Sequence, residues 1–548
     1  MGSLGTAPNP AAGAPACLQP PVQPPHTANA NASVNVPHRF IALEWANVDR
    51  FSTPIRRLDI VRSLHQLPRM KDHRASSLPT NSDSLHSAPP TWSRRQFLRT
   101  ATVAGVAAPL FVSYGSTPPG RKPVSANGKL NHACIGVGGM GWVDLQNFLQ
   151  HQKVQIVALC DVDSNNLDKA AKAVPGARTY TDWRELLQKE GDNIDSVNAA
   201  VPDHTHFSIA YSAIQKGKHV YCQKPLCHDV AEIRVLTEAA VKKGVMTQLG
   251  TQVASSIHDR TGVQWLREGR IGKITHAYLC SNRPGAVEAY RLVGPRPAIG
   301  QAPPPSLAWD LWLGTAPVRP YAPDIYHQTK WRAWQDFGTG WSGDIGCHIF
   351  DAVWKGLDLK APLTVYAEVQ ESWKNSTARR ADTWPQGDHI TWTFPGNDKI
   401  SGQELVLEWS DGEYFPPEHI RKLYSADLKE YPPESSMLIG TEGALLIPLD
   451  LPPQLQPEEK FSNDQRPKLP PRNHYHHFVD ACLGGEKTES HFAQTGPMAE
   501  AIILGTVAVR VPGQKLEWNS PRLKVTNSSE ANHFLQRKYR EGWHLAKF

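Results

Sequence analysis

Asp344 and His348 have side-chain types and a spacing that suit proton transfer. They are four residues apart in the stretch 343–348, and residues at that spacing project from one face of a helix. Oxidation of a secondary alcohol needs a base for the hydroxyl proton while a hydride leaves for a nicotinamide, and histidine titrates in the useful range. The spacing by itself favours a simpler interpretation, a helix N-terminal aspartate followed by a core histidine.

A dinucleotide-binding site is predicted by the stretch 131–161. An apolar run leads into Gly136, Gly138 and Gly141 with G-x-G-x-x-G spacing, and a predicted helix and a second apolar run follow. The first glycine permits a tight turn, the second lets the backbone approach a pyrophosphate, and the third lets helix and strand pack closely. The helix N-terminus offers N–H groups to the phosphate charge. The predicted cofactor contacts here are Gly136, Gly138, Gly139, Met140 and Gly141.

The second apolar run ends at Asp161, which predicts the choice of cofactor. An acidic residue at this strand end can accept both ribose hydroxyls, and its charge repels a 2′-phosphate. We therefore expect NAD, with NADP disfavoured. Asp163 is the alternative ribose ligand if Asp161 only caps the next helix.

Strands and helices continue to alternate after Asp161, which predicts a doubly wound parallel sheet. Ligands bind at the carboxyl ends of strands in such a sheet, so the loops 202–206, 223–225 and 250–252 should face the nicotinamide. We predict an NAD-binding Rossmann domain over residues 128–255. Its further cofactor contacts are predicted to be Pro202, His204, Lys224, Pro225 and Gln252.

A second domain is predicted after residue 255, where the pattern changes. Predicted strands at 274–280, 363–369, 389–394 and 404–409 follow one another with little helix between them. This pattern indicates an α+β domain over residues 256–520, built on a mostly antiparallel sheet. Residues 521–548 are expected to form a C-terminal tail.

These motifs together resemble one protein family. The glycine fingerprint, the run Pro202 to His206, the Lys224-Pro225 step and the D-x-G-x-H of Asp344 to His348 resemble the glucose–fructose oxidoreductase and inositol dehydrogenase family, Gfo/Idh/MocA. The stretch from Tyr326 to His348 is similar to the exported, twin-arginine bacterial branch of that family. The resemblance covers about residues 130 to 520, and it implies a large open sheet in the second domain.

The resemblance implies roles for three residues. His348 would be the base, Lys224 would polarise the reacting oxygen and tune the base, and Asp344 would orient the substrate or the histidine. It reverses the simpler interpretation of Asp344 and His348 given above. The family usually has E-K-P where this chain has Gln223-Lys224-Pro225, which makes contacts at Gln223 uncertain.

The family's open sheet often lies at a subunit interface, which implies a homo-oligomer, either a dimer or a tetramer. Substrate contacts are predicted from Trp331, Arg332 and Trp341, because indole faces stack on the C–H surfaces of sugars. Most tryptophans of this crowded region could equally belong to the core.

No metal site is predicted. The histidines at 474, 476 and 477 lack an evident fourth ligand, and Cys222, Cys227 and His228 lack a closing ligand pair.

Charge is unevenly distributed along the 548 residues. The first 127 residues contain 13 Lys/Arg and 5 Asp/Glu, whereas the remainder contains 45 Lys/Arg and 47 Asp/Glu. The predicted folded part is therefore near neutral, and nothing in it indicates nucleic-acid binding.

An export signal is predicted over residues 93–120. Ser93, two arginines at 94 and 95, a Phe-Leu step and the apolar stretch 101–112 match the twin-arginine pattern, and the stretch is too short for a permanent membrane span. The preceding residues 1–92 are rich in Pro, Ala, Asn and Ser and are expected to be disordered. Such signals lie near the N-terminus, so translation is expected to start at Met70.

The sequence predicts an exported, NAD(P)-dependent oxidoreductase that acts on a secondary hydroxyl of a sugar or glycoside. Outside the cytoplasm a freely exchanging cofactor would be lost, so NAD should be held tightly and recycled within one cycle. Two alternatives stay open: a redox-neutral glycosidase or lyase that forms a keto-sugar, and a non-catalytic NAD- and sugar-binding regulator. The expected partners are a carbohydrate and the twin-arginine translocase. The expected location is the periplasm, or the membrane if the signal is retained.

Overall fold

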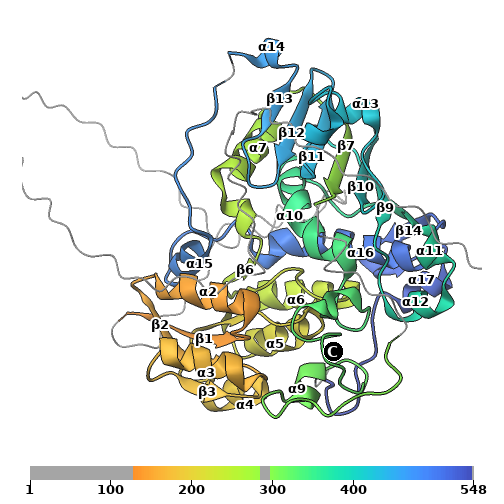
Figure 1. Ribbon diagram of the computed structural model, residues 1–548. Coiled ribbons are helices and arrows are strands. Elements are labelled where there is room, and N and C mark those ends of the chain that lie inside the picture. Colours follow the sequence, from red (N-terminus) through yellow and green to blue (C-terminus); the bar gives the residue numbers. More distant parts are fainter. Residues whose placement is uncertain (1–127, 284–295, 464, 546–548) are drawn as a thin grey trace, which may run out of the picture. The chain divides into compact units, whose positions relative to one another are not determined.

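The computed structural model describes residues 128–283, 296–463 and 465–545 (Figure 1). The extension predicted over residues 1–92, the signal segment at 93–120 and Met70 lie outside the described residues.

The first domain contains a six-stranded parallel sheet in the order β3-β2-β1-β4-β5-β6, as predicted for a doubly wound fold. Its strands are β1 (Leu130–Ile135), β2 (Val154–Cys160), β3 (Arg178–Tyr180), β4 (Ser196–Ala199), β5 (His219–Cys222) and β6 (Thr247–Leu249). The helices between them are α2 (Gly139–Leu149), α3 (Ser164–Ala173), α4 (Trp183–Glu190), α5 (Asp203–Gln215) and α6 (Val230–Lys243).

Both faces of this sheet are covered by helices, as the side chains of β1 show, since they alternate between two hydrophobic clusters. Ala133 and Ile135 belong to one hydrophobic cluster and Cys134 belongs to another, because successive residues of a strand point to opposite faces. The second cluster contains Phe478 of α15 (His474–Cys482), a helix that comes much later in the chain. The continuous apolar runs seen in the sequence are therefore strands buried on two sides.

The second domain is built on a nine-stranded sheet in the order β13-β12-β11-β7-β10-β9-β8-β14-β15. The strands are β7 (Ile274–Ser281), β8 (Thr364–Val369), β9 (Asp388–Pro395), β10 (Glu404–Asp411), β11 (Glu434–Gly440), β12 (Ala444–Pro448), β13 (Gln454–Gln456), β14 (Leu516–Asn519) and β15 (Lys524–Val525). Their pairings are antiparallel except for that of β10 with β7, which confirms the mostly antiparallel prediction.

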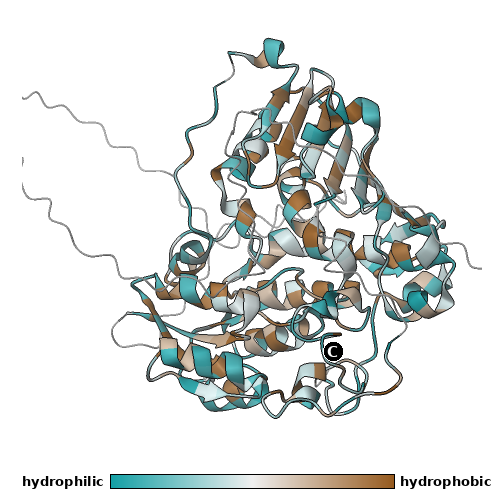
Figure 2. Cartoon of the chain, in the orientation of Figure 1, coloured by the Kyte–Doolittle hydropathy of each residue, from teal (hydrophilic) through white to brown (hydrophobic). Residues whose placement is uncertain are grey.

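One face of this sheet is buried and the other is partly open. Residues of β9 alternate strictly between buried and half-buried, and Figure 2 shows apolar residues beside polar ones along these strands. The buried face packs against helices that include α7 (Ile257–Arg267), α10 (Gly340–Gly356) and α16 (Phe492–Arg510).

Helix α16 joins the two domains, because it packs against α6 on one side and against α10, β8 and β9 on the other. Among the described residues it is the one helix long and apolar enough to cross a membrane, but 83% of its apolar window is buried. A helix that is apolar all round is expected in such a core position.

The C-terminal residues are part of the fold, which differs from the predicted tail at 521–548. Strand β15 pairs with β14 across the predicted boundary, and α17 (Ser529–His533) follows. These elements are too short to show a periodic pattern of apolar residues.

Candidate active site

The glycine turn between β1 and α2 is shaped for a bound dinucleotide. Gly136 has a φ of +79°, and a Cβ added there would lie 2.2 Å from the carbonyl oxygen of Ala200. A Cβ on Gly141 would lie 2.1 Å from the carbonyl oxygen of Gly136. The N–H groups of Gly139 and Met140 have no hydrogen-bond acceptor among the described residues. Bare backbone and unused N–H groups at a helix N-terminus fit a pyrophosphate.

Asp161 lies at the end of β2, directly beside this turn. Its Oδ2 accepts hydrogen bonds from the N–H groups of Val137 (2.9 Å) and Gly138 (3.2 Å), and burial raises its pKa. Asp163, by contrast, caps α3 by accepting from the N–H of Asn165. The capping role therefore falls to Asp163, and the ribose contact of Asp161 stays a prediction.

Lys224 and Asp344 meet although 120 residues separate them. The Nζ of Lys224 donates to Asp344 Oδ1 at 2.6 Å and to the Asp344 carbonyl at 3.1 Å. The Nε of Arg332 donates to the other carboxylate oxygen, Oδ2, at 3.1 Å. Both oxygens of this buried carboxylate are thus held by cationic side chains, which fixes its orientation.

His348 lies on the same helix, α10, one turn after Asp344, as the spacing predicted. Burial, and after it the positive charge of Lys224, lowers its pKa to about 3. Its Nδ1 is buried and has no hydrogen-bond partner among the described residues. The imidazole is therefore neutral at neutral pH, which is the protonation state that a general base needs.

Asp203 is a site residue that sequence reasoning missed. It begins α5 at the carboxyl end of β4, is buried, and accepts a hydrogen bond from the hydroxyl of Thr339 at 3.0 Å. Burial, and after it the charge of Asp344, raises its pKa. Its place directly after Pro202 in the loop predicted to face the nicotinamide was the available signal.

Gln223, the departure from E-K-P, is paired with a second buried carboxylate. Its Nε2 lies 2.9 and 3.0 Å from the two oxygens of Asp144 on α2, and the Tyr475 hydroxyl also donates to Asp144. Burial raises the pKa of Asp144 to about 7, against the lowering effect of these hydrogen bonds. Gln252 donates to the hydroxyls of Tyr221 and Tyr475, and its contact with the cofactor stays a prediction. The amide of Gln223 can donate hydrogen bonds to the carboxylate of Asp144, whereas a glutamate at this position would repel that carboxylate.

Three other predicted site residues lie in the core. The ring of His204 is fully buried against Trp312 and Phe337, and its Nε2 lies 3.1 Å from the Trp312 carbonyl. This surrounding gives His204 a packing role in place of the predicted cofactor contact.

Trp331 and Trp341 are 5% and 9% exposed. The Trp341 indole donates to the carbonyl of Ser281, and the Arg332 guanidinium lies 4.2 Å from the Trp331 ring centre. Burial of both rings favours the core interpretation, and sugar stacking stays a prediction.

Two family models match the chain where these features lie. The model described as oxidoreductase family, NAD-binding Rossmann fold, matches residues 130–251, and the oxidoreductase family C-terminal alpha/beta domain matches residues 280–415. The chain belongs to the Gfo/Idh/MocA oxidoreductase family. As a member of this family it has an NAD-binding Rossmann domain, and the glycine turn and Asp161 fit that cofactor.

Curated relatives of this Gfo/Idh/MocA protein include glycosidases. It is 30% identical over 199 residues to a glycosyl hydrolase family 109 protein of Solibacter usitatus, which is 34% of this chain and 44% of that protein. It is also 30% identical over 152 residues to the alpha-N-acetylgalactosaminidase of Bacteroides fragilis, covering 26% of this chain and 35% of that protein. The matches thus span less than half the length of these relatives.

A solved structure of similar fold is the WlbA dehydrogenase from Chromobacterium violaceum in complex with NADH and UDP-GlcNAcA. The superposition has a TM-score of 0.50 at 14% identity and covers 72% of this chain and 98% of that chain. This likeness supports the two-domain fold and nothing finer.

Proposed function

We propose that this protein is an NAD-dependent enzyme that oxidises a secondary hydroxyl of a sugar or glycoside. The observation that supports this most directly is the assembly of Lys224, Asp344 and His348 at the carboxyl end of the Rossmann sheet. Lys224 follows β5, and the other two project from α10 of the second domain. A base, a cation and an orienting carboxylate are the groups that alcohol oxidation requires.

Each side chain has a defined task in this proposal. NAD, when bound, would supply the hydride acceptor. His348 takes the hydroxyl proton, because burial keeps its ring neutral at neutral pH. Lys224 stabilises the negative charge that develops on the oxygen, and Asp344 holds the ammonium in place through the 2.6 Å contact.

A second candidate, redox-neutral glycosidic cleavage, is favoured by the names of the curated relatives. Oxidation to a ketone acidifies the neighbouring C–H bond, and loss of that proton expels the glycosidic oxygen as an alcohol. Water then adds to the resulting double bond, and return of the hydride restores the hydroxyl, so the cycle is balanced in electrons. This route needs the same residues and a cofactor that never leaves.

The first experiment is to purify the full chain, denature it and identify any released nucleotide by mass spectrometry. The native protein is then incubated with p-nitrophenyl glycosides, including the α-N-acetylgalactosaminide, without added cofactor. Released nitrophenol together with near-stoichiometric NAD supports the closed cycle. NADH accumulation only with added NAD supports a simple dehydrogenase. Bound NAD without turnover of any sugar, glycoside or polyol would favour the non-catalytic regulator.

We further propose that the protein is exported, on the support of the twin-arginine pattern at residues 93–98. Replacing Arg94 and Arg95 by lysine should hold it in the cytoplasm, as measured by cell fractionation. Equal distribution of wild type and variant would contradict export by this route. N-terminal sequencing of the precursor tests the start at Met70, since residues before it would exclude that start.

A further inference from the structure

The end of the described chain returns to the Rossmann domain and places Arg537 among buried acidic groups. Its Nη2 donates to the carbonyl oxygen of His204 and to Glu232 Oε1, and its Nε lies 3.2 Å from Asp229 Oδ2. Glu232 is completely buried and also accepts a hydrogen bond from the Tyr539 hydroxyl. Because two buried carboxylates face this guanidinium, its removal would leave Glu232 without its main counter-charge and Asp229 with His228 as its remaining ionisable partner.

These contacts join the two loops that follow β4 and β5. His204 comes directly after Asp203 at the start of α5, and Asp229 caps α6 five residues after Lys224. Arg537 bonds both loops at once, and it does so from a segment more than 300 residues later in the chain.

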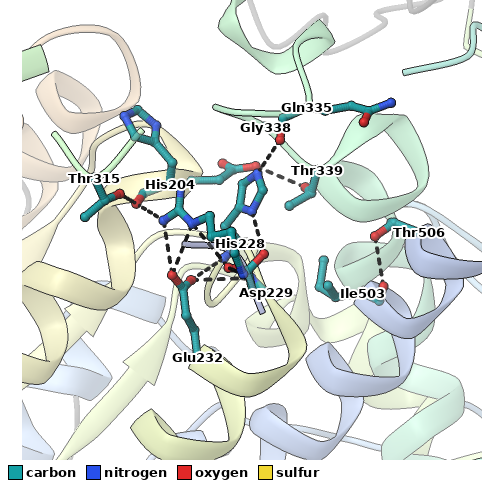
Figure 3. Close-up of polar contacts among 12 residues, drawn as sticks. His204, His228, Asp229, Glu232, Thr315, Gln335, Gly338, Thr339, Ile503 and Thr506 are labelled. Carbon is teal, nitrogen blue, oxygen red and sulfur yellow. Dashed lines mark hydrogen bonds and ion pairs between the residues drawn. The ribbon is translucent and has the colours of Figure 1, made fainter. Parts of the chain in front are cut away.

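His228 links this pair of loops to a third one. Its Nδ1 lies 2.9 Å from Asp229 Oδ1, and its Nε2 lies 2.9 Å from the carbonyl oxygen of Gln335 (Figure 3). Gln335 is in the loop between Arg332 and Thr339, where α10 begins. Asp229 therefore shares its two carboxylate oxygens between Arg537 and His228, and the network reaches the loop that contains Arg332.

We propose that Arg537, through Asp229 and His228, is a positioning residue that fixes Lys224 relative to Asp344. Among the described residues, neither Arg537 nor His228 forms a hydrogen bond or ion pair with Lys224. They act on Lys224 indirectly, by holding together the loops after β4 and β5 and the loop that contains Gln335. This inference deepens the proposed function, and its kinetic consequence rests on that function. The placement of Lys224 can be measured without turnover.

The test compares Arg537→Gln with Arg540→Gln as a matched control. Arg540 belongs to the same segment, is similarly buried (14% against 15% exposed side chain), and bonds Asp310 and the Gly314 carbonyl outside the three loops. The reaction of Lys224 with acetic anhydride is measured by peptide mass spectrometry, relative to the exposed Lys189 of the same molecule. Arg537→Gln should raise the relative labelling of Lys224 about threefold or more, a coupling typical within one network. Arg540→Gln should leave it unchanged.

A second variant, His228→Gln, breaks the link to Gln335 while leaving Arg537 on Glu232, and it should also raise the labelling. If Arg537→Gln does not fold, this variant decides the question. Wild-type labelling of Lys224 in the folded variants, or an equal rise in Arg540→Gln, would overturn the proposal.

The kinetic readout separates positioning from general stability. In Arg537→Gln we expect kcat to fall about tenfold to hundredfold, as for a small misplacement of reacting groups. The Kd of NADH should stay within about twofold, because the glycine turn is untouched. A fall in NADH affinity with unchanged kcat would count against positioning. If the wild type turns over no substrate, the proposed function fails while the labelling result still stands.

Discussion

The glycine turn and the charged cluster around Asp344, which contains Lys224 and Arg332, differ in how far apart in the chain the contacting residues lie. In the turn, Asp161 bonds Val137 only 24 residues away. In the cluster, Lys224 and Asp344 are 120 residues apart, and Arg537 reaches Asp229 across 308 residues. The cofactor end of the site is thus encoded locally, whereas the reactive end is assembled from separate parts of the chain.

Different interactions also determine the geometry of the two regions. The turn depends on the absence of a Cβ, a steric condition that a single methyl group violates. The cluster depends on pairing of buried charges, whose contribution varies with geometry and protonation. Substitutions in the two regions should therefore affect different measurements.

The largest effect is expected for Lys224→Met. Turnover should fall about 10³-fold, the scale for loss of one group that stabilises the developing charge, while NADH binding changes far less. Steady-state kinetics and NADH fluorescence titration measure the two quantities. Lys224→Arg, which keeps the charge, should recover part of the activity. An equal loss of turnover and NADH affinity would contradict the separation between the two regions.

Gly136→Ala should have the opposite pattern, because it weakens cofactor binding and leaves the Lys224–Asp344 pair in place. The added Cβ would lie 2.2 Å from the Ala200 carbonyl, and NADH affinity should fall about 100-fold because the turn must open. The matched control is Gly176→Ala, which has a φ of +90° but nothing within 4 Å of the added Cβ. Equal losses in the two variants would show that backbone strain alone, and not the close approach at the turn, is responsible.

Gln223→Glu tests whether the departure from E-K-P is matched to Asp144. A second buried carboxylate should lower the free energy of unfolding by about 2 kcal/mol at pH 8, through like-charge repulsion and desolvation. Since the pKa of Asp144 is raised to about 7, its protonation near pH 6 should reduce this loss. Urea unfolding at both pH values measures it. A loss that does not depend on pH would contradict the pairing.

The smallest effect concerns the pH dependence given by His348. Its folded pKa of about 3 lies below the ordinary value of 6.5, so its contribution to stability is complete above pH 6.5 and is lost as pH falls toward 3. Between these values the wild type should lose about 1.4 kcal/mol per pH unit more than His348→Gln. Urea unfolding of both proteins at pH 6.5 and 5.5 checks this, and over that single pH unit the expected difference is about 1 kcal/mol. Parallel stability curves would show that the ring is not held neutral.

Much of the fold was predictable from local patterns. The apolar run at 154–159 and the four predicted strands of the second domain lie within one or two residues of the observed bounds, whereas the run at 133–137 begins three residues after β1 begins. Asp344 and His348 share α10 as their spacing required. These features depend on residues close in sequence, and periodicity reports them directly.

Other parts of the site could not be predicted in this way. Asp203, Asp144 and Arg537 have no distinctive spacing, and their environments come from distant segments. His204 looked like a cofactor contact because it follows a strand, but Trp312 and Phe337 from a later loop enclose its ring. Because residues from a distant segment bury His204, no pattern in the neighbouring sequence indicates that it is buried.

Local sequence patterns were sufficient for the dinucleotide turn, the order of strands and helices, and the helix that presents Asp344 and His348. Steric limits and side-chain periodicity act over short stretches, so residues close in the chain specify these features. Folding in three dimensions sets which charges pair, places Gln223 against Asp144 and brings Arg537 to the site loops. Electrostatic pairing and desolvation depend on distances in space, and those distances exist only once the chain is folded.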